Sequence, residues 1–399
     1  MTLINIESLQ SPIPGDRFSL FELGFRPFFL AAGIVAIALL LGWMGLLLSV
    51  FDADVYYGAS VWHGHEMVFG FAVAVIAGFL LTAVRNWTST QTLKGSMLLA
   101  LVMLWLTGRL LPLFSTILPA WLIALVDIAF LPLLALSLAI PIIKAKKRPQ
   151  LIFVAMLLLM SLGNFMVHAE LLGVSEGSAA LGINLAINIV VLMIVIMAGR
   201  VFPMFTKNGA PGAKPRKWPW LEKSAIVTVA ALLIVELLYP QPWLIAGLAA
   251  VAALVHAARL WGWSSRLVCS VPLLWVLHLG YAWLVLGFAF KALVVTEMIA
   301  PVLASHAIAA AITVLCLGMM SRVALGHTGR PLLPAKAMAW AFALINLAMV
   351  LRVLVPVFLP SLSAAATIVS GGLWVAAFVM FVSVYLPILI RARVDGQPG

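Results

Sequence analysis

Charged residues are scarce in this sequence. Asp, Glu, Lys and Arg make up 9% of the 399 residues, whereas apolar residues make up 64%. A soluble globular domain carries about 25% charged residues, so the composition excludes that class of protein. Apolar runs of about 20 residues, the length of a bilayer-spanning helix, recur from Phe28 to Ile390. Alternating segments typical of membrane barrel strands are missing, so we expect an all-α polytopic membrane protein.

Several motifs of soluble enzymes are also missing. The two cysteines, Cys269 and Cys316, lie in or near apolar spans, which excludes a disulfide framework and a CxxC redox site. There is no GxxxxGKS phosphate loop and no GxGxxG motif after a strand, so nucleotide chemistry has no visible site. The first 27 residues are charged and lack an apolar core, so no cleaved signal peptide is expected. Any activity is expected among the helices.

The apolar runs predict about twelve membrane-spanning helices, at residues 28–50, 64–84, 95–113, 119–143, 150–172, 182–205, 223–239, 242–261, 271–291, 300–322, 334–358 and 363–390. Nearly all of the 24 Lys and Arg residues fall in alternate loops, and the exceptions are Arg109, Lys291 and Arg352. Cations concentrate on the cytoplasmic side of a membrane protein, so both termini are predicted to be cytoplasmic. The net charge of +11 then reflects topology, and no nucleic-acid partner is expected.

The longest expected loop, between residues 206 and 222, is rich in Gly, Pro and Lys. It divides the chain into an N-terminal segment, a six-helix half, a linker, a second six-helix half and a tail, at residues 1–27, 28–205, 206–222, 223–390 and 391–399. Two six-helix halves are typical of transporters built from inverted repeats. No motif of the first half recurs in the second, so a transporter for a metal ion or small anion is the alternative function.

The segment Trp62–Glu66 reads WHGHE and places His63, His65 and Glu66 at the outer end of the second span. Ionisable residues at membrane depth are functional candidates, and imidazole is a ligand for iron, copper and zinc. The two histidines diverge by roughly 200° on a regular helix, so they converge on one metal only if His63 lies in the preceding turn. The alternative is a set of interfacial polar residues beside an aromatic belt.

His168 lies near the outer end of the fifth span, with Asn164 and Ser161 on the same helix face. The helical rise places His168 at about the depth of His65, so the two can share a site. The alternative is hydrogen bonding between helices. Asp127, inside the fourth span, is either a proton-relay carboxylate or a neutral, hydrogen-bonded acid.

His278 and His306 lie on consecutive spans. Counted at about 1.5 Å per residue from opposite membrane faces, both are expected near the midplane on neighbouring antiparallel helices. Tyr281 flanks His278 and adds a hydrogen-bonding face. Metal ligation and structural hydrogen bonding both remain open for this pair.

Three further residues lie near the inner face. His327 belongs to the loop motif GHTGR, where it can cap a helix or bind a propionate or phosphate together with Arg330. Arg26 opens the first span and can extend to the lipid headgroups or pair with a propionate.

Five segments together resemble the NnrS family. They are LGFRPFFLAAG (Leu23–Gly33), WHGHEMVFGFAVAVIAGFLLTAVRNWT (Trp62–Thr88), GRVFPMFTKNG (Gly199–Gly209), LHLGYAW (Leu277–Trp283) and MMSRVALGHTGRPL (Met319–Leu332). They keep the order of the family. The resemblance implies a multi-pass protein of the bacterial inner membrane that contains haem and copper and takes part in the nitric oxide response of denitrifying and nitrosatively stressed bacteria. The histidines of its motifs map to His63, His65, His278, His306 and His327, whereas His168 lies outside them.

From these observations we expect haem at one or both of His278 and His306. Copper is expected nearby, or in the outer site of His63, His65 and His168, with Glu66 as a further metal candidate. Nitric oxide is the expected ligand and can arrive through the bilayer because it is small and apolar. Whether the protein turns over nitric oxide, with electrons from a membrane donor, or only binds it is left open, and so is its oligomeric state.

Overall fold

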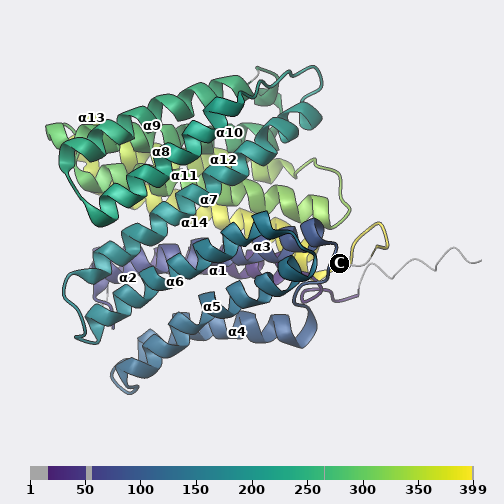
Figure 1. Cartoon of the computed structure of the whole chain (residues 1–399), viewed down its shortest axis with the longest axis horizontal. Coiled ribbons are helices and arrows are strands. Elements are labelled where there is room, and N and C mark those ends of the chain that lie inside the picture. The colour runs from purple at the N-terminus through teal and green to yellow at the C-terminus, as the bar shows by residue number, and fades with distance from the viewer. Residues whose placement is uncertain (1–16, 51–55, 265, 398–399) are drawn as a thin grey trace, which may run out of the picture.

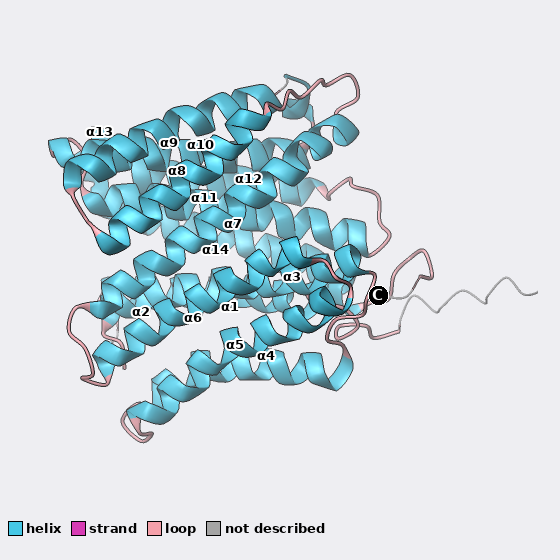
Figure 2. Cartoon of the chain, in the orientation of Figure 1, coloured by secondary structure: helices cyan, strands magenta, loops and turns pink. Residues whose placement is uncertain are grey.

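The computed structural model describes residues 17–50, 56–264 and 266–397. Within these ranges the chain is helical, apart from loops and one isolated bridge between Phe18 and Arg391 (Figure 2). The helices are α1 (Phe25–Leu47), α2 (Ala59–His65), the π-helix η2 (Glu66–Ala72), α3 (Val73–Thr88), α4 (Gly95–Leu110), α5 (Ala120–Lys144), α6 (Leu151–Leu171), α7 (Ser178–Gly209), α8 (Pro219–Leu238), α9 (Pro242–Trp263), α10 (Pro272–Leu293), α11 (Pro301–His327), α12 (Lys336–Met349), the π-helix η7 (Val350–Leu354), α13 (Val355–Phe358) and α14 (Ser363–Ile390). Short 3₁₀ turns lie at Leu111–Phe114, Arg148–Gln150, Arg266–Ser270, Val294–Thr296 and Pro360–Leu362.

In the described part of the chain, 11 helical segments are long and apolar enough to cross a membrane. The α8 helix is not among them, although its 20 residues overlap the seventh expected span. It carries three charged residues, Glu222, Lys223 and Glu236, within its 20 residues, which is more charge than a membrane-spanning segment of this length usually has. The predicted all-α polytopic architecture is confirmed.

The long helices run side by side (Figure 1). The α7 helix packs against both α6 and α8, and α14 packs against both α1 and α12. Each of these two helices therefore contacts helices from both expected halves of the chain. The division of the chain at residues 206–222 into two halves stays a prediction.

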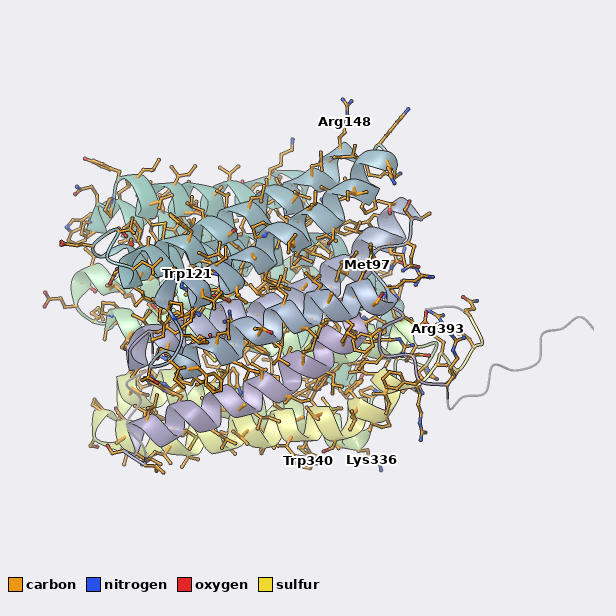
Figure 3. The ribbon with its side chains drawn as sticks, turned by 90° about the horizontal axis from the view of Figure 1, so that it is seen from below. Met97, Trp121, Arg148, Lys336, Trp340 and Arg393 are labelled. Carbon is orange, nitrogen blue, oxygen red and sulfur yellow. The ribbon has the colours of Figure 1, made fainter. Side chains whose placement is uncertain are left out.

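The outside of the bundle is apolar around its middle and basic at one end. Leu136 on α5, Leu158 on α6 and Val251 on α9, each near the middle of its helix, are about half exposed, as expected for side chains that face lipid. In Figure 3, Arg148 and Arg393 lie towards the same end of the bundle. This gathering agrees with the expected clustering of cations, while the assignment of that end to the cytoplasm stays a prediction.

Small residues bring α10 and α11 together. A Cβ atom added to Gly280 would lie 2.6 Å from Leu315, and one added to Gly287 would lie 2.5 Å from Ile308. Close packing at glycine is typical of membrane helices, because lipid supplies no hydrophobic force between them. The two contacts fix the register of this antiparallel pair.

Candidate metal centre and central cavity

A cluster of polar side chains is buried where α2, η2, α4, α5 and α6 meet. Its members are His65, Glu66, Arg109, Asp127, Asn164 and His168, and all are buried. Ionisable groups in an apolar bundle are stable only when they pair with one another or bind an ion. The cluster is therefore the first candidate for a metal centre.

Three side chains of the cluster offer metal-ligating atoms to a common point. His65 Nε2 lies 3.2 Å from Asp127 Oδ2, and His168 Nε2 lies 2.9 Å from the same oxygen. One ligand atom from each of the three residues lies within 4.8 Å of the other two. Two imidazole nitrogens and a carboxylate oxygen are a donor set used for copper, zinc and iron. The expectation that His65 and His168 share a depth is confirmed, since their ring centroids are 5.7 Å apart.

Asn164 and Glu66 are the hydrogen-bond partners of the two ring nitrogens of His65. Asn164 Nδ2 donates to Asp127 Oδ2 at 3.1 Å, so Asn164 Oδ1 accepts from His65 Nε2 at 2.8 Å. His65 Nδ1 faces Glu66 Oε1 at 3.1 Å. Both ring nitrogens of His65 therefore face oxygen acceptors. One additional proton in the cluster satisfies these contacts and balances the charges of Glu66, Asp127 and Arg109.

Arg109 holds both carboxylates in place. Its Nη1 donates to Glu66 Oε1 at 2.6 Å, and its Nη2 pairs with Asp127 Oδ1. A Cβ atom at Gly108 would lie 2.8 Å from Asp127 Oδ1, so the glycine makes room for this carboxylate. Partners of this kind, which orient ligands without touching the metal, affect metal affinity strongly.

Two tyrosines that precede α2 cover the cluster. The hydroxyl of Tyr56 donates to His168 Nδ1 at 3.1 Å, and the ring of Tyr57 stacks on His65 with centroids 4.4 Å apart. Burial raises the pKa of Tyr56 to about 12 and that of Tyr57 well above its ordinary value. Both phenols are therefore neutral at physiological pH, and they shield the cluster from water.

His63 faces a separate, partly open cavity of about 310 Å³, here called the central cavity, which lies between helices of both expected halves towards the end of the bundle that holds His63 and His306. The cavity is lined by α1, α2, η2, α7, α11, η7 and α14, mostly through apolar side chains. The ring of His63 stacks on Trp43 with centroids 4.3 Å apart. His63 and His65 both belong to α2, so they diverge as expected for a regular helix and do not share one site.

His306 and Arg352 lie on the wall of the same cavity. His306 Nδ1 donates to the Val302 carbonyl at 2.6 Å, which leaves Nε2 as an acceptor. Arg352 Nη2 donates to this Nε2 at 3.0 Å. His306 is therefore a neutral imidazole with both nitrogens engaged.

The expectation that His278 and His306 share a depth is wrong. Gly280 lies opposite Leu315, and Gly287 lies opposite Ile308, so Leu317 lies opposite His278. Leu317 is 11 residues from His306 on α11, or about 16 Å at the helical rise. The error arose because each histidine was counted from a different membrane face. His278 Nδ1 donates to the Leu274 carbonyl at 2.9 Å, and His278 does not line the cavity.

Tyr281 belongs to a second buried network near His278. Its hydroxyl lies 2.6 Å from His256 Nδ1 and accepts from Arg259 Nη1 at 2.8 Å. Arg259 also pairs with Glu222 at 2.5 Å. These contacts tie α8, α9 and α10 together, and they engage the Tyr281 hydroxyl within the protein.

Two of the residues predicted near the inner face, Arg26 and His327, contact the C-terminal segment. Arg26 Nη1 donates to the carbonyl oxygens of Leu389 at 2.9 Å and Arg391 at 2.6 Å. Arg393 donates to the His327 carbonyl at 3.1 Å. The anion-binding roles of Arg26, His327 and Arg330 stay predictions, and these residues are not part of the polar cluster.

The three cations that break the charge pattern all have partners inside the bundle. Arg109 binds Glu66 and Asp127, Lys291 pairs with Glu236 at 2.5 Å, and Arg352 donates to His306. The sequence marks Asp127 only as a proton relay or a hydrogen-bonded acid, and it does not predict Arg109 or Arg352 as site residues. Their signal in the sequence was a charge on the wrong side of the membrane or inside a span.

The family comparison covers nearly the whole chain. The family model described as NnrS protein matches residues 19–393. The chain belongs to the NnrS family. The resemblance seen in the five motifs is thereby confirmed, and the NnrS match includes every helix that forms the polar cluster and the cavity. No curated protein matches this chain.

Proposed function

We propose that this NnrS-family chain is a haem- and copper-containing membrane protein of the nitric oxide response, which binds or processes nitric oxide or iron-nitrosyl species. The observation that carries the proposal is the buried set of His65, Asp127 and His168. Family membership and this cluster fit a membrane metal-binding protein. The identity of the metals, nitric oxide as the ligand and a bacterial inner-membrane location belong to the proposal.

The residues of the cluster fit a copper ion. Copper accepts imidazole nitrogen and carboxylate oxygen, and a cation can replace the additional proton that balances the cluster. Bound copper would supply a one-electron redox centre. The protein itself orients His65 through Asn164 and fixes Asp127 through Arg109. Tyr56 and Tyr57 keep water away from the histidines.

The central cavity is where the described residues best fit a haem. Its volume of about 310 Å³ falls in the range of cofactor pockets, and its walls are largely apolar. The ring nitrogens of His63 have no hydrogen-bond partner in the described part of the chain, whereas those of His306 are both engaged. A haem there would supply an iron that binds diatomic gases. We therefore propose His63 as its first candidate ligand, ahead of His306 and His278.

The test combines metal analysis with absorbance spectroscopy of the full chain purified in detergent. We expect copper, and a Soret band that shifts when nitric oxide is added to the dithionite-reduced protein. His65→Ala and His168→Ala should lose copper and keep the Soret band, whereas His63→Ala should lose the band and keep copper. His327→Ala, outside both sites, is the control. Full copper and haem in all three variants would overturn the assignment.

Turnover and simple binding of nitric oxide differ in their need for protons. The carboxylates of Glu66 and Asp127 are both held by Arg109, and such fixed pairs make a poor proton route. This favours binding over rapid turnover. Loss of nitric oxide consumption in an Asp127→Asn variant that keeps its haem would favour an enzyme instead.

One observation favours the alternative of a transporter. The cavity lies between helices of the first expected half, such as α1 and α7, and helices of the second, such as α11 and α14. Transporters bind their substrates at such an interface. Uptake of copper or nitrite into proteoliposomes, with no haem and no stably bound copper in the purified protein, would support this alternative.

A further inference from the structure

Arg352 differs from the other two cations that break the charge pattern. Arg109 has two carboxylate partners, and Lys291 has Glu236. Arg352 donates to the neutral His306, and no Asp or Glu is found among the cavity-lining side chains that the structure describes. The cavity therefore contains a positive charge that no described carboxylate balances.

A partly buried guanidinium in this position is stabilised by an anion. Charges at membrane depth are costly, and the cost falls when an opposite charge binds. The guanidinium carries five N–H donors in a planar fork that fits two oxygens of one anion. The contact with His306 uses one edge of the fork and fixes its orientation on the cavity wall.

The cavity wall around Arg352 has both polar and apolar side chains, so it can hold a molecule with a small polar group and an apolar part. His63, Asn184 and Thr313 line the same cavity and can add hydrogen bonds, while Trp43 and Trp374 supply apolar walls. Arg352 belongs to the π-helix η7, and the second π-helix, η2, also lines the cavity. Such local departures from the α-helix are frequent at functional sites.

We propose that the central cavity binds an anionic oxygen group through Arg352, with His306 as the residue that positions the guanidinium. The group is a carboxylate or a small oxoanion with two oxygens on one plane. Two sources can supply it, a free oxoanion or the carboxylate of a bound cofactor, and the second source rests on the haem proposed for this cavity. The proposal does not depend on a metal at His65, Asp127 and His168.

The test measures thermal unfolding of the full chain in an uncharged detergent. Sodium formate and sodium nitrite are titrated against sodium chloride, whose anion has no pair of oxygens, at constant ionic strength. Ligands that bind the folded state raise Tm with concentration. We expect this rise in the wild type and in Thr367→Val, which removes a cavity hydroxyl that already donates to the Ser363 carbonyl at 2.9 Å, and its loss in Arg352→Met. Arg352→Lys keeps the charge without the fork and should shift the titration to higher concentrations.

Binding of a cofactor carboxylate is tested by a separate measurement. If the wild type does not respond to formate or nitrite, small molecules are extracted and compared by mass spectrometry. A carboxylate-bearing molecule present in the wild type and lost in Arg352→Met would identify a cofactor as the source. An equal rise of Tm in Arg352→Met would overturn the proposal, and so would no rise together with no such molecule. Copper is measured in the same samples, so a failure of the metal assignment at His65 and His168 is seen separately.

Discussion

His63 and His65 lie on the same turn of α2 and face different sites. The ring of His63 stacks on Trp43 at the cavity, whereas His65 Nε2 lies 3.2 Å from Asp127 Oδ2 in the polar cluster. The π-helix η2 starts directly after His65 and buries Glu66 on the same side. One short motif therefore forms the wall between the two candidate sites, and each histidine can be altered separately.

His168→Ala is expected to lower copper content by at least tenfold. The change removes one of the three ligating side chains and leaves Asp127 with one imidazole fewer. Loss of even an outer partner of a metal ligand typically costs 10- to 100-fold in affinity. Copper per protein is measured by mass spectrometry of the purified variant, with His63→Ala as the control. Wild-type copper content in His168→Ala would exclude this residue as a ligand.

Arg109→Met is expected to reduce both stability and copper content. The change leaves Glu66 and Asp127 as buried carboxylates without their cation, which typically costs about 3–5 kcal/mol. Lys291→Met is the matched control, because it breaks a membrane ion pair with Glu236 away from the cluster. Tm and copper content are measured for both variants. If Arg109→Met loses no more copper than Lys291→Met, Arg109 has a structural role alone.

Copper affinity is expected to fall as the pH is lowered. Both ring nitrogens of His65 face oxygen acceptors, an arrangement that one additional proton would satisfy, and copper would have to displace that proton. Protons and copper compete, so a lower pH favours the proton, by about tenfold in affinity per pH unit for each proton released. The dissociation constant is measured with a competing chelator between about pH 6 and 8. A constant affinity over this range would contradict the proton balance.

Gly108→Ala is expected to weaken the cluster through Asp127. The new Cβ would lie 2.8 Å from Asp127 Oδ1, so the carboxylate has to move away from Arg109 or from the histidines. Overpacking of this kind costs about 1–3 kcal/mol. Gly372→Ala is the control, because its Cβ would meet nothing within 4 Å. We expect a lower Tm and less copper in Gly108→Ala only, and equal behaviour of both variants would show that Asp127 tolerates the shift.

The sequence by itself predicted the architecture and the depth of one pair of histidines. Apolar runs of bilayer length require helices, because backbone groups in lipid must form their hydrogen bonds within one segment. The helical rise then placed His65 and His168 at one level, since both were counted from the same membrane face. The family motifs, from Leu23 to Leu332, were also present in the sequence alone.

Only the tertiary structure decided which side chains meet. The register of α10 and α11 depends on how Gly280 and Gly287 pack, and it separates His278 from His306. The sequence marked Arg109 and Arg352 as unusual cations, but their partners lie on other helices, and which residues of those helices face them depends on packing. Rise along a helix is fixed by backbone geometry, whereas rotation and register between helices depend on side-chain packing. Packing therefore placed His65 in the polar cluster and His63 in the cavity.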